Sequence, residues 1–112
     1  MDRELANEVK RLADASDPLR NGALKAATDT SVAQGQRDAA DTDMRELKKA
    51  SQQLESNLMN HRAIAADVTR VVDLSGKAVS FAQSAGPLSP EAASALTAIQ
   101  GVAQSLTVAF GR

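Results

Sequence analysis

The chain has 112 residues, a formal net charge of −1 and no cysteine. This length allows one domain with a modest core. The small net charge gives no overall field to recruit nucleic acid or an anionic membrane. The lack of cysteine excludes disulfides, thiolate nucleophiles and cysteine-ligated metals. Phe81 and Phe110 are the only aromatic residues, so a core must pack small side chains closely, which favours helices and disfavours a ligand pocket.

Charge is distributed unevenly along the sequence. Of 13 basic and 14 acidic residues, only Glu91 and Arg112 follow Lys77. The chain therefore has a charged body and a nearly uncharged final third. The N-terminus, Met1-Asp2-Arg3-Glu4-Leu5, is charged and lacks the apolar core of a signal peptide. We expect a cytoplasmic protein, or one exported without a cleavable signal peptide.

Residues 1–37 are predicted to form two short helices. Apolar residues spaced by four and three from Leu5 to Leu19 indicate an amphipathic helix. The pair Asp17-Pro18 predicts a break, because Asp is a good N-cap and Pro suits the first turn of a new helix. The second helix, ending near Ala33, is weak because it contains Asn, Gly, Thr and Ser.

Residues 38–84 are predicted to form one long helix. This segment has no proline and a single glycine, Gly76, which is the expected place for a bend. Its seam keeps strict heptad spacing over roughly five heptads, as a coiled coil requires. The seam positions are Leu47, Ser51, Leu54, Leu58, His61, Ala65, Val68, Val72, Ser75, Val79 and Ala82.

Residues 85–89 are predicted to form a turn and residues 90–110 a final helix. Gly86 suits a helix C-cap, Ser89 an N-cap and Pro90 the first helical position. The short turn makes the final helix an antiparallel partner of the preceding one. Between Ala92 and Phe110 this helix has no charged residue, so no face of it is strongly hydrated and burial on several sides is expected.

Small residues recur every four positions on this final helix. Such spacing lets two helix backbones approach closely. An alanine-rich helix also produces such a stripe by chance, and both interpretations stay open. The stripe consists of Ala93, Thr97, Gly101, Ser105 and Ala109.

These segments predict an all-α protein of one domain: a helical bundle or coiled coil with a long central helix and a C-terminal antiparallel αα-hairpin. A helix of about 20 residues covers only about 30 Å of its partner. The long helix would be thinly covered in one chain, so we expect a homo-oligomer. The predicted interaction surface is Leu47, Leu54, Leu58, Val68, Val72, Val79, Leu96, Ile99, Val102, Leu106 and Phe110.

His61 is the single histidine and falls on the heptad seam. It is either a buried pH-sensitive group or metal ligand repeated by symmetry, or a polar residue that sets the register of the seam. The second interpretation is favoured, because Asn57 and Ala65 occupy the positions four residues away, where a second ligand would stand.

The charged clusters are interpreted without a bound cation or nucleic acid. Asp38, Asp41 and Asp43 are expected to form the acidic first turn of the long helix. Arg45, Lys48, Lys49 and Arg62 are expected to form a solvated face. No phosphate loop, nucleophile elbow or zinc spacing occurs. The sequence predicts no catalytic, cofactor-binding or metal-binding residue.

The function expected from these patterns is non-enzymatic self-assembly, as a structural or adaptor subunit whose partner is itself or another helical protein. In being cysteine-free, aromatic-poor and rich in Ala, Ser, Thr and Gln, the chain resembles in composition the subunits of bacterial secretion and flagellar filaments. Two alternatives remain open. One is a membrane-active or lipid-surface protein that inserts residues 78–110. The other is a small helical inhibitor or chaperone of one partner protein.

Overall fold

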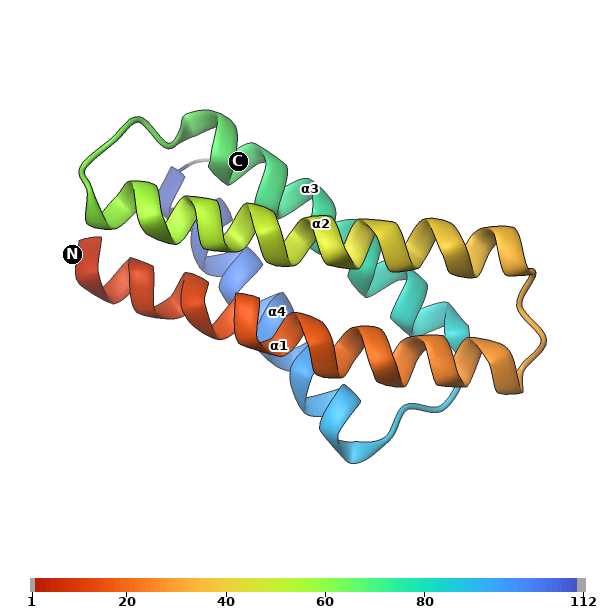
Figure 1. Ribbon diagram of the computed structural model, residues 1–112. Coiled ribbons are helices and arrows are strands. Elements are labelled where there is room, and N and C mark those ends of the chain that lie inside the picture. Colours follow the sequence, from red (N-terminus) through yellow and green to blue (C-terminus); the bar gives the residue numbers. More distant parts are fainter. Residues whose placement is uncertain (1, 111–112) are drawn as a thin grey trace.

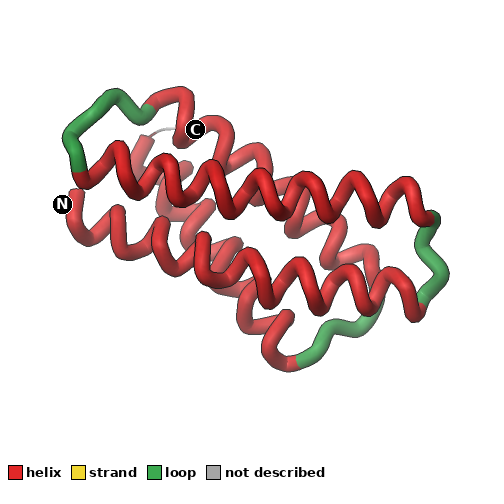
Figure 2. Tube along the Cα trace, viewed as in Figure 1, coloured by secondary structure: helices red, strands yellow, loops and turns green. Residues whose placement is uncertain are grey.

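Four α-helices make up the regular structure of residues 2–110, the part of the chain that a computed structural model describes. They are α1 (Asp2–Asp29), α2 (Gln34–Met59), α3 (Ala65–Ala85) and α4 (Pro90–Phe110). Each helix packs against the next in the chain, and α1 also packs against α4, which closes the bundle (Figure 1). Short loops join the helices (Figure 2). The predicted all-α class and helical bundle are confirmed.

The core is built from aliphatic side chains and alanine, and all four helices contribute to it. Neither phenylalanine is fully buried, since Phe81 is half-buried and Phe110 is exposed. With alanine filling the positions between the larger residues, the helices pack into a bundle of 44 × 25 × 21 Å. The largest fully buried side chains include Leu12, Leu19, Met44, Leu47, Leu54, Ile99 and Leu106.

The predicted division of residues 1–37 into two short helices is wrong. Helix α1 continues through Pro18, whose ring lies on the exposed side of the helix. A proline inside a helix removes one backbone hydrogen bond. The apolar seam, however, stays in phase across the proline, so an unbroken helix buries both halves on one face. The buried seam runs through Val9, Leu12, Ser16, Leu19, Ala23 and Ala26.

The predicted single helix over residues 38–84 is also wrong, because the chain reverses between Met59 and Ala65. At the end of α2, the backbone N–H of Arg62 donates to the carbonyl of Asn57 at 2.9 Å, and that of His61 donates to Leu58 at 3.3 Å. This pair of hydrogen bonds is a Schellman motif. His61 occupies its left-handed position with φ of 56°, a place usually taken by glycine.

The same motif ends α1, and four loop residues separate α1 from α2. The backbone N–H of Val32 donates to Ala27 at 2.9 Å, and that of Ser31 donates to Thr28 at 3.2 Å. Ser31 takes the left-handed position with φ of 61°. Gly76, where a bend was expected, lies inside α3 and does not end it. At these two chain reversals, Ser31 and His61 thus take the left-handed position where glycine is the usual residue.

The turn before α4 was predicted correctly. Gly86 follows the last residue of α3 with φ of 119°, and the Ser89 hydroxyl accepts a hydrogen bond from the backbone N–H of Ala92 at 3.2 Å. The hydroxyl of Thr30 donates to the carbonyl of Ala85 at 2.7 Å. This last contact fixes the end of α3 to the end of α1.

Charged side chains join α1 to α2 along the rim of the core. Lys48 Nζ of α2 lies 2.6 Å from Asp17 of α1, and Arg20 of α1 lies 3.0 Å from Asp41 of α2. Within α2, Arg45 lies 3.1 Å from the same Asp41. The hydrogen bond from Lys48 lowers the pKa of Asp17, against the opposing effect of partial burial. Partial burial would raise the pKa of Asp41, but hydrogen bonds from Arg20 and Arg45 outweigh it, so this pKa is also lowered.

Replacing Gly22 with alanine is expected to lower the free energy of unfolding by about 1–3 kcal/mol. A Cβ at this position would overlap the side chain of Ala92, where α1 and α4 approach closely. Gly76→Ala is the matched control, since an added Cβ there meets no atom within 4 Å. It should raise stability by up to about 1 kcal/mol. Urea denaturation measures the free energy of unfolding of both variants. Equal changes for Gly22→Ala and Gly76→Ala would contradict the α1–α4 contact.

Acid is expected to destabilise the bundle through Asp17 and Asp41. Both pKa values lie below the ordinary value in the folded state, so this stabilisation is complete above about pH 4 and is lost as pH falls through the lowered values. Asp41→Asn should lower the free energy of unfolding at pH 7 by about 0.5 kcal/mol. Measured by urea denaturation at both pH values, it should also make the fall in this free energy between pH 7 and pH 3 smaller. The control, Asp38→Asn, should retain the full loss, because Asp38 has no ion pair among residues 2–110.

Candidate interaction surface

Helix α4 has one face in the core and one face in solvent. Its buried residues are Ala92, Ala95, Ile99, Val102 and Leu106. The opposite side carries small and uncharged residues that no part of residues 2–110 covers. We define the outer face of α4 as Ala93, Thr97, Gln100, Gly101, Gln104 and Val108, all of which are exposed.

The outer face of α4 differs from the exposed sides of the other helices in having no charge. Exposed residues of α1, α2 and α3 include Lys10, Lys49 and Arg70 respectively. In α4 the single charged residue is Glu91, in the first turn. The face therefore has few groups that bind water strongly, and covering it removes little favourable hydration.

Two large apolar side chains are exposed near the C-terminal end of α4: Val108 lies on the outer face, whereas Phe110 follows Leu106 by one turn and lies on the opposite side of the helix. Val108 is 72% exposed and Phe110 is 38% exposed. By length and composition alone, the described chain has one helix able to cross a membrane, α4, with a mean hydropathy of 1.2 over an 18-residue segment. Only 22% of that segment is buried within the chain. Much of this apolar helix is thus open to another molecule.

The predicted interaction surface is placed mostly inside one chain. Val72, Val79 and Leu96 are half-buried, and Phe110 is exposed. At the other seven positions the side chains are buried within one chain and not between chains. For those of α2 and α3, the reason is that the reversal at His61 brings both halves of the seam together. The side chains buried within the single bundle are Leu47, Leu54, Leu58, Val68, Ile99, Val102 and Leu106.

The small-residue stripe predicted on this helix lies on its solvent side. Ala93, Thr97, Gly101 and Ala109 are exposed and Ser105 is half-buried. The Ser105 hydroxyl donates to the carboxylate of Glu8 on α1 at 3.4 Å. Periodicity alone identified this stripe, because the stripe and the buried seam occupy different sides of the same helix.

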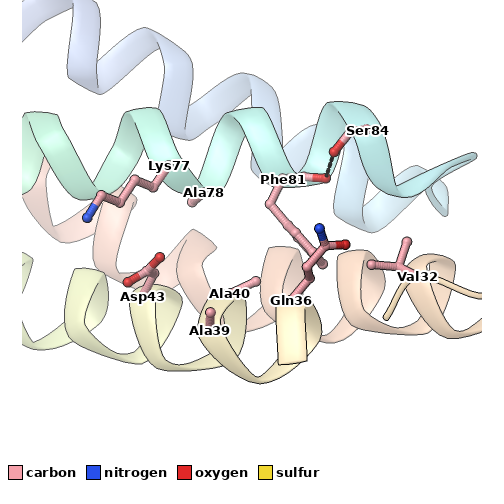
Figure 3. A pocket seen from close by; sticks show the side chains of 9 residues that line it. All are labelled: Val32, Gln36, Ala39, Ala40, Asp43, Lys77, Ala78, Phe81 and Ser84. Carbon is pink, nitrogen blue, oxygen red and sulfur yellow. Dashed lines mark hydrogen bonds between the residues drawn. The ribbon is translucent and has the colours of Figure 1, made fainter. Parts of the chain in front are cut away.

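A groove between α2 and α3 is a second open surface, with a volume of about 460 Å³. Its floor is apolar, with Ala40 and Ala78 at the bottom and Phe81 reaching across from α3 (Figure 3). At one end Asp43 and Lys77 stand on opposite walls (Figure 3). Sequence reasoning missed this groove, since it exists only because α3 folds back on α2.

The titratable residues singled out in the sequence do not gather into one site. His61 is exposed in the α2–α3 turn and does not lie on a buried seam as predicted. The predicted acidic first turn is also wrong, because α2 begins at Gln34, upstream of Asp38. Within residues 2–110, no group of three or more His, Cys, Asp and Glu side chains is placed to hold a metal ion.

The predicted basic face is partly neutralised by ion pairs. Lys48 reaches Asp17 on α1, as described above, and Lys49 lies 3.9 Å from Glu46. Glu46 also pairs with Arg70 of α3 at 2.6 Å. The contacts of Lys48 and Glu46 tie α2 to both of its neighbours, while Arg45, Lys49 and Arg62 are exposed to solvent.

Comparison of the chain with models of protein families, with curated proteins and with solved structures finds no match in any of the three. The function is therefore argued from the surfaces of the bundle. Of these surfaces, the outer face of α4 combines the absence of charge with an exposed large apolar side chain, Val108.

Proposed function

We propose that the chain is a non-enzymatic interaction protein, a structural or adaptor subunit that docks on another protein through the outer face of α4. The observation that carries the proposal is the exposure of an uncharged helix whose neighbours all carry charge on their exposed sides. Docking through the α1 or α2 surface would remove the exposed ion pairs Lys10–Asp14 or Lys49–Glu46 from water, and the lost hydration of both charges opposes binding.

The apolar C-terminal end of the outer face supplies a favourable contribution to the free energy of binding. Burial of apolar surface contributes about 25 cal/mol for each Å² removed from water. Val108 and Phe110 are the largest exposed apolar side chains of α4. A partner on the outer face is expected to cover Val108, with the small residues of the face admitting its backbone or side chains closely.

The bundle places α4 against α1 before any partner arrives. Gly22 of α1 lies directly against Ala92 near the start of α4, and Glu8 accepts the hydrogen bond from Ser105 near its end. A surface ordered in advance loses less conformational entropy on binding than a segment that must fold first. The other three helices thus serve as a scaffold that presents α4.

Site-specific photo-crosslinking in cells that naturally make the protein tests this proposal. A photoreactive amino acid at Gln100, on the outer face, is expected to give covalent adducts with protein. The matched control is Gln52, an exposed glutamine on α2. Adducts confined to position 100 support the proposal. Equal labelling at both positions, or none at position 100, contradicts it.

A lipid surface is the second candidate partner, favoured by the length and hydropathy of α4. Flotation with vesicles of phosphatidylcholine and phosphatidylglycerol separates the two candidates. Under the leading proposal the protein stays with the soluble fraction. Flotation that Val108→Glu abolishes, and that the exposed control Gln52→Glu does not, would replace the protein partner with lipid.

A further inference from the structure

We propose that the partner of the outer face of α4 is a second copy of the chain, packed α4 against α4 with Gly101 of each copy at the centre of the contact. This inference rests on the proposed function and names its partner. The argument uses the charge of the face, the space around Gly101 and the area that two such faces can bury.

The absence of charge on the outer face of α4 restricts the kind of partner that can cover it. A charged partner surface would lose its hydration against α4 and find no opposite charge between Ala92 and Phe110. Within residues 2–110, α1, α2 and α3 each expose charged residues, and only α4 offers a long uncharged face. The same face of a second copy is therefore the matching surface that the chain itself supplies. Contact between identical faces gives a closed two-fold dimer.

Gly101 lies near the middle of the uncharged segment and is exposed. A Cβ added there would meet no atom within 4 Å in a single chain, so nothing within the bundle requires a glycine. A glycine inside a helix costs about 1 kcal/mol relative to alanine. Gly35 and Gly76 are equally open, but Gly101 is the one that lies on the uncharged face, where close backbone approach by another helix would give the glycine a role. Because Gly101 is central, it meets its counterpart in either a parallel or an antiparallel pair.

The neighbours of Gly101 support the same contact. Thr97 stands one turn before it, and Gln100 and Gln104 flank it on the exposed side. A glutamine side chain both donates and accepts hydrogen bonds, so two copies can pair their amides across the rim without any charge. Self-pairing of this kind needs no second type of residue.

The size of the face predicts a weak dimer. Helix α4 is about 30 Å long, and the exposed half of a helix of about 10 Å diameter adds a width of about 15 Å. Two such faces bury at most about 900 Å² in total, which is below the area of a standard stable interface and within the range of transient ones. Association should therefore depend on concentration.

Sedimentation equilibrium from about 5 µM to about 500 µM tests the inference, because this range covers the weak affinities expected of a small interface. The wild-type chain is expected to move from monomer to dimer. Thr97→Arg should keep the chain monomeric, since it would bury two like charges. Circular dichroism checks that this variant keeps its helical content, so that loss of the dimer is not loss of the fold.

A pair of glycine variants separates contact from stability. Gly101→Ala and Gly76→Ala should both stabilise the monomer, because both glycines lie in exposed helix interiors with open space around them. Gly101→Ala should also raise the dimer dissociation constant about tenfold by separating the two helices. Gly76→Ala should leave that constant unchanged. Equal constants for both variants would overturn the placement of Gly101.

Disulfide trapping gives an independent readout, because the natural chain has no cysteine. Gly101→Cys should form a covalent dimer under mild oxidation, whereas Ser80→Cys, exposed on α3, should not. A chain that stays monomeric across the whole range overturns the inference. In that case adducts to a different protein at Gln100 would leave the proposed function standing, and no adducts at all would remove both.

Discussion

The reversal of the chain at His61 is the constraint on which the rest of the structure depends. The apolar seam from Leu47 to Ala82 keeps one phase, so without the reversal it would lie along one side of a long, thinly covered helix. The Schellman motif folds this seam onto itself and places Leu54 and Val68 in one core. The seam is then buried within one chain, and the apolar surface that stays uncovered is the outer face of α4.

The helical class and the turn before α4 could be predicted because local chemistry and periodicity agree there. Gly86, Ser89 and Pro90 each suit a single position in a helix–turn–helix connection. The reversal at His61 could not be predicted, because its left-handed position carries no glycine. The seam is also equally in phase in a straight helix and in a hairpin. Periodicity tells which side of a helix is buried, but it does not tell what buries it.

Pro18 shows the opposite case, in which a strong local signal is overridden. The pair Asp17-Pro18 has the chemistry of a helix start, yet burial of Leu12 and Leu19 on one face keeps α1 continuous. Part of the outer face of α4 could be found from the sequence, since Ala93, Thr97 and Gly101 belong to the stripe of small residues, which needs no tertiary information. The α2–α3 groove could not, because Asp43 and Lys77 become neighbours only through the reversal.

The order of packing also bears on how the chain folds. Helices α1 and α2, α2 and α3, and α3 and α4 are each joined by a short loop, so most contacts form between nearby parts of the sequence. Chains with such local contacts fold within microseconds to milliseconds. The contact of α1 with α4 is the main long-range exception, since it joins Gly22 to Ala92. Docking of α4 on α1 is therefore expected to be the last step of folding, and the first region to open again is the helix that presents the interaction surface.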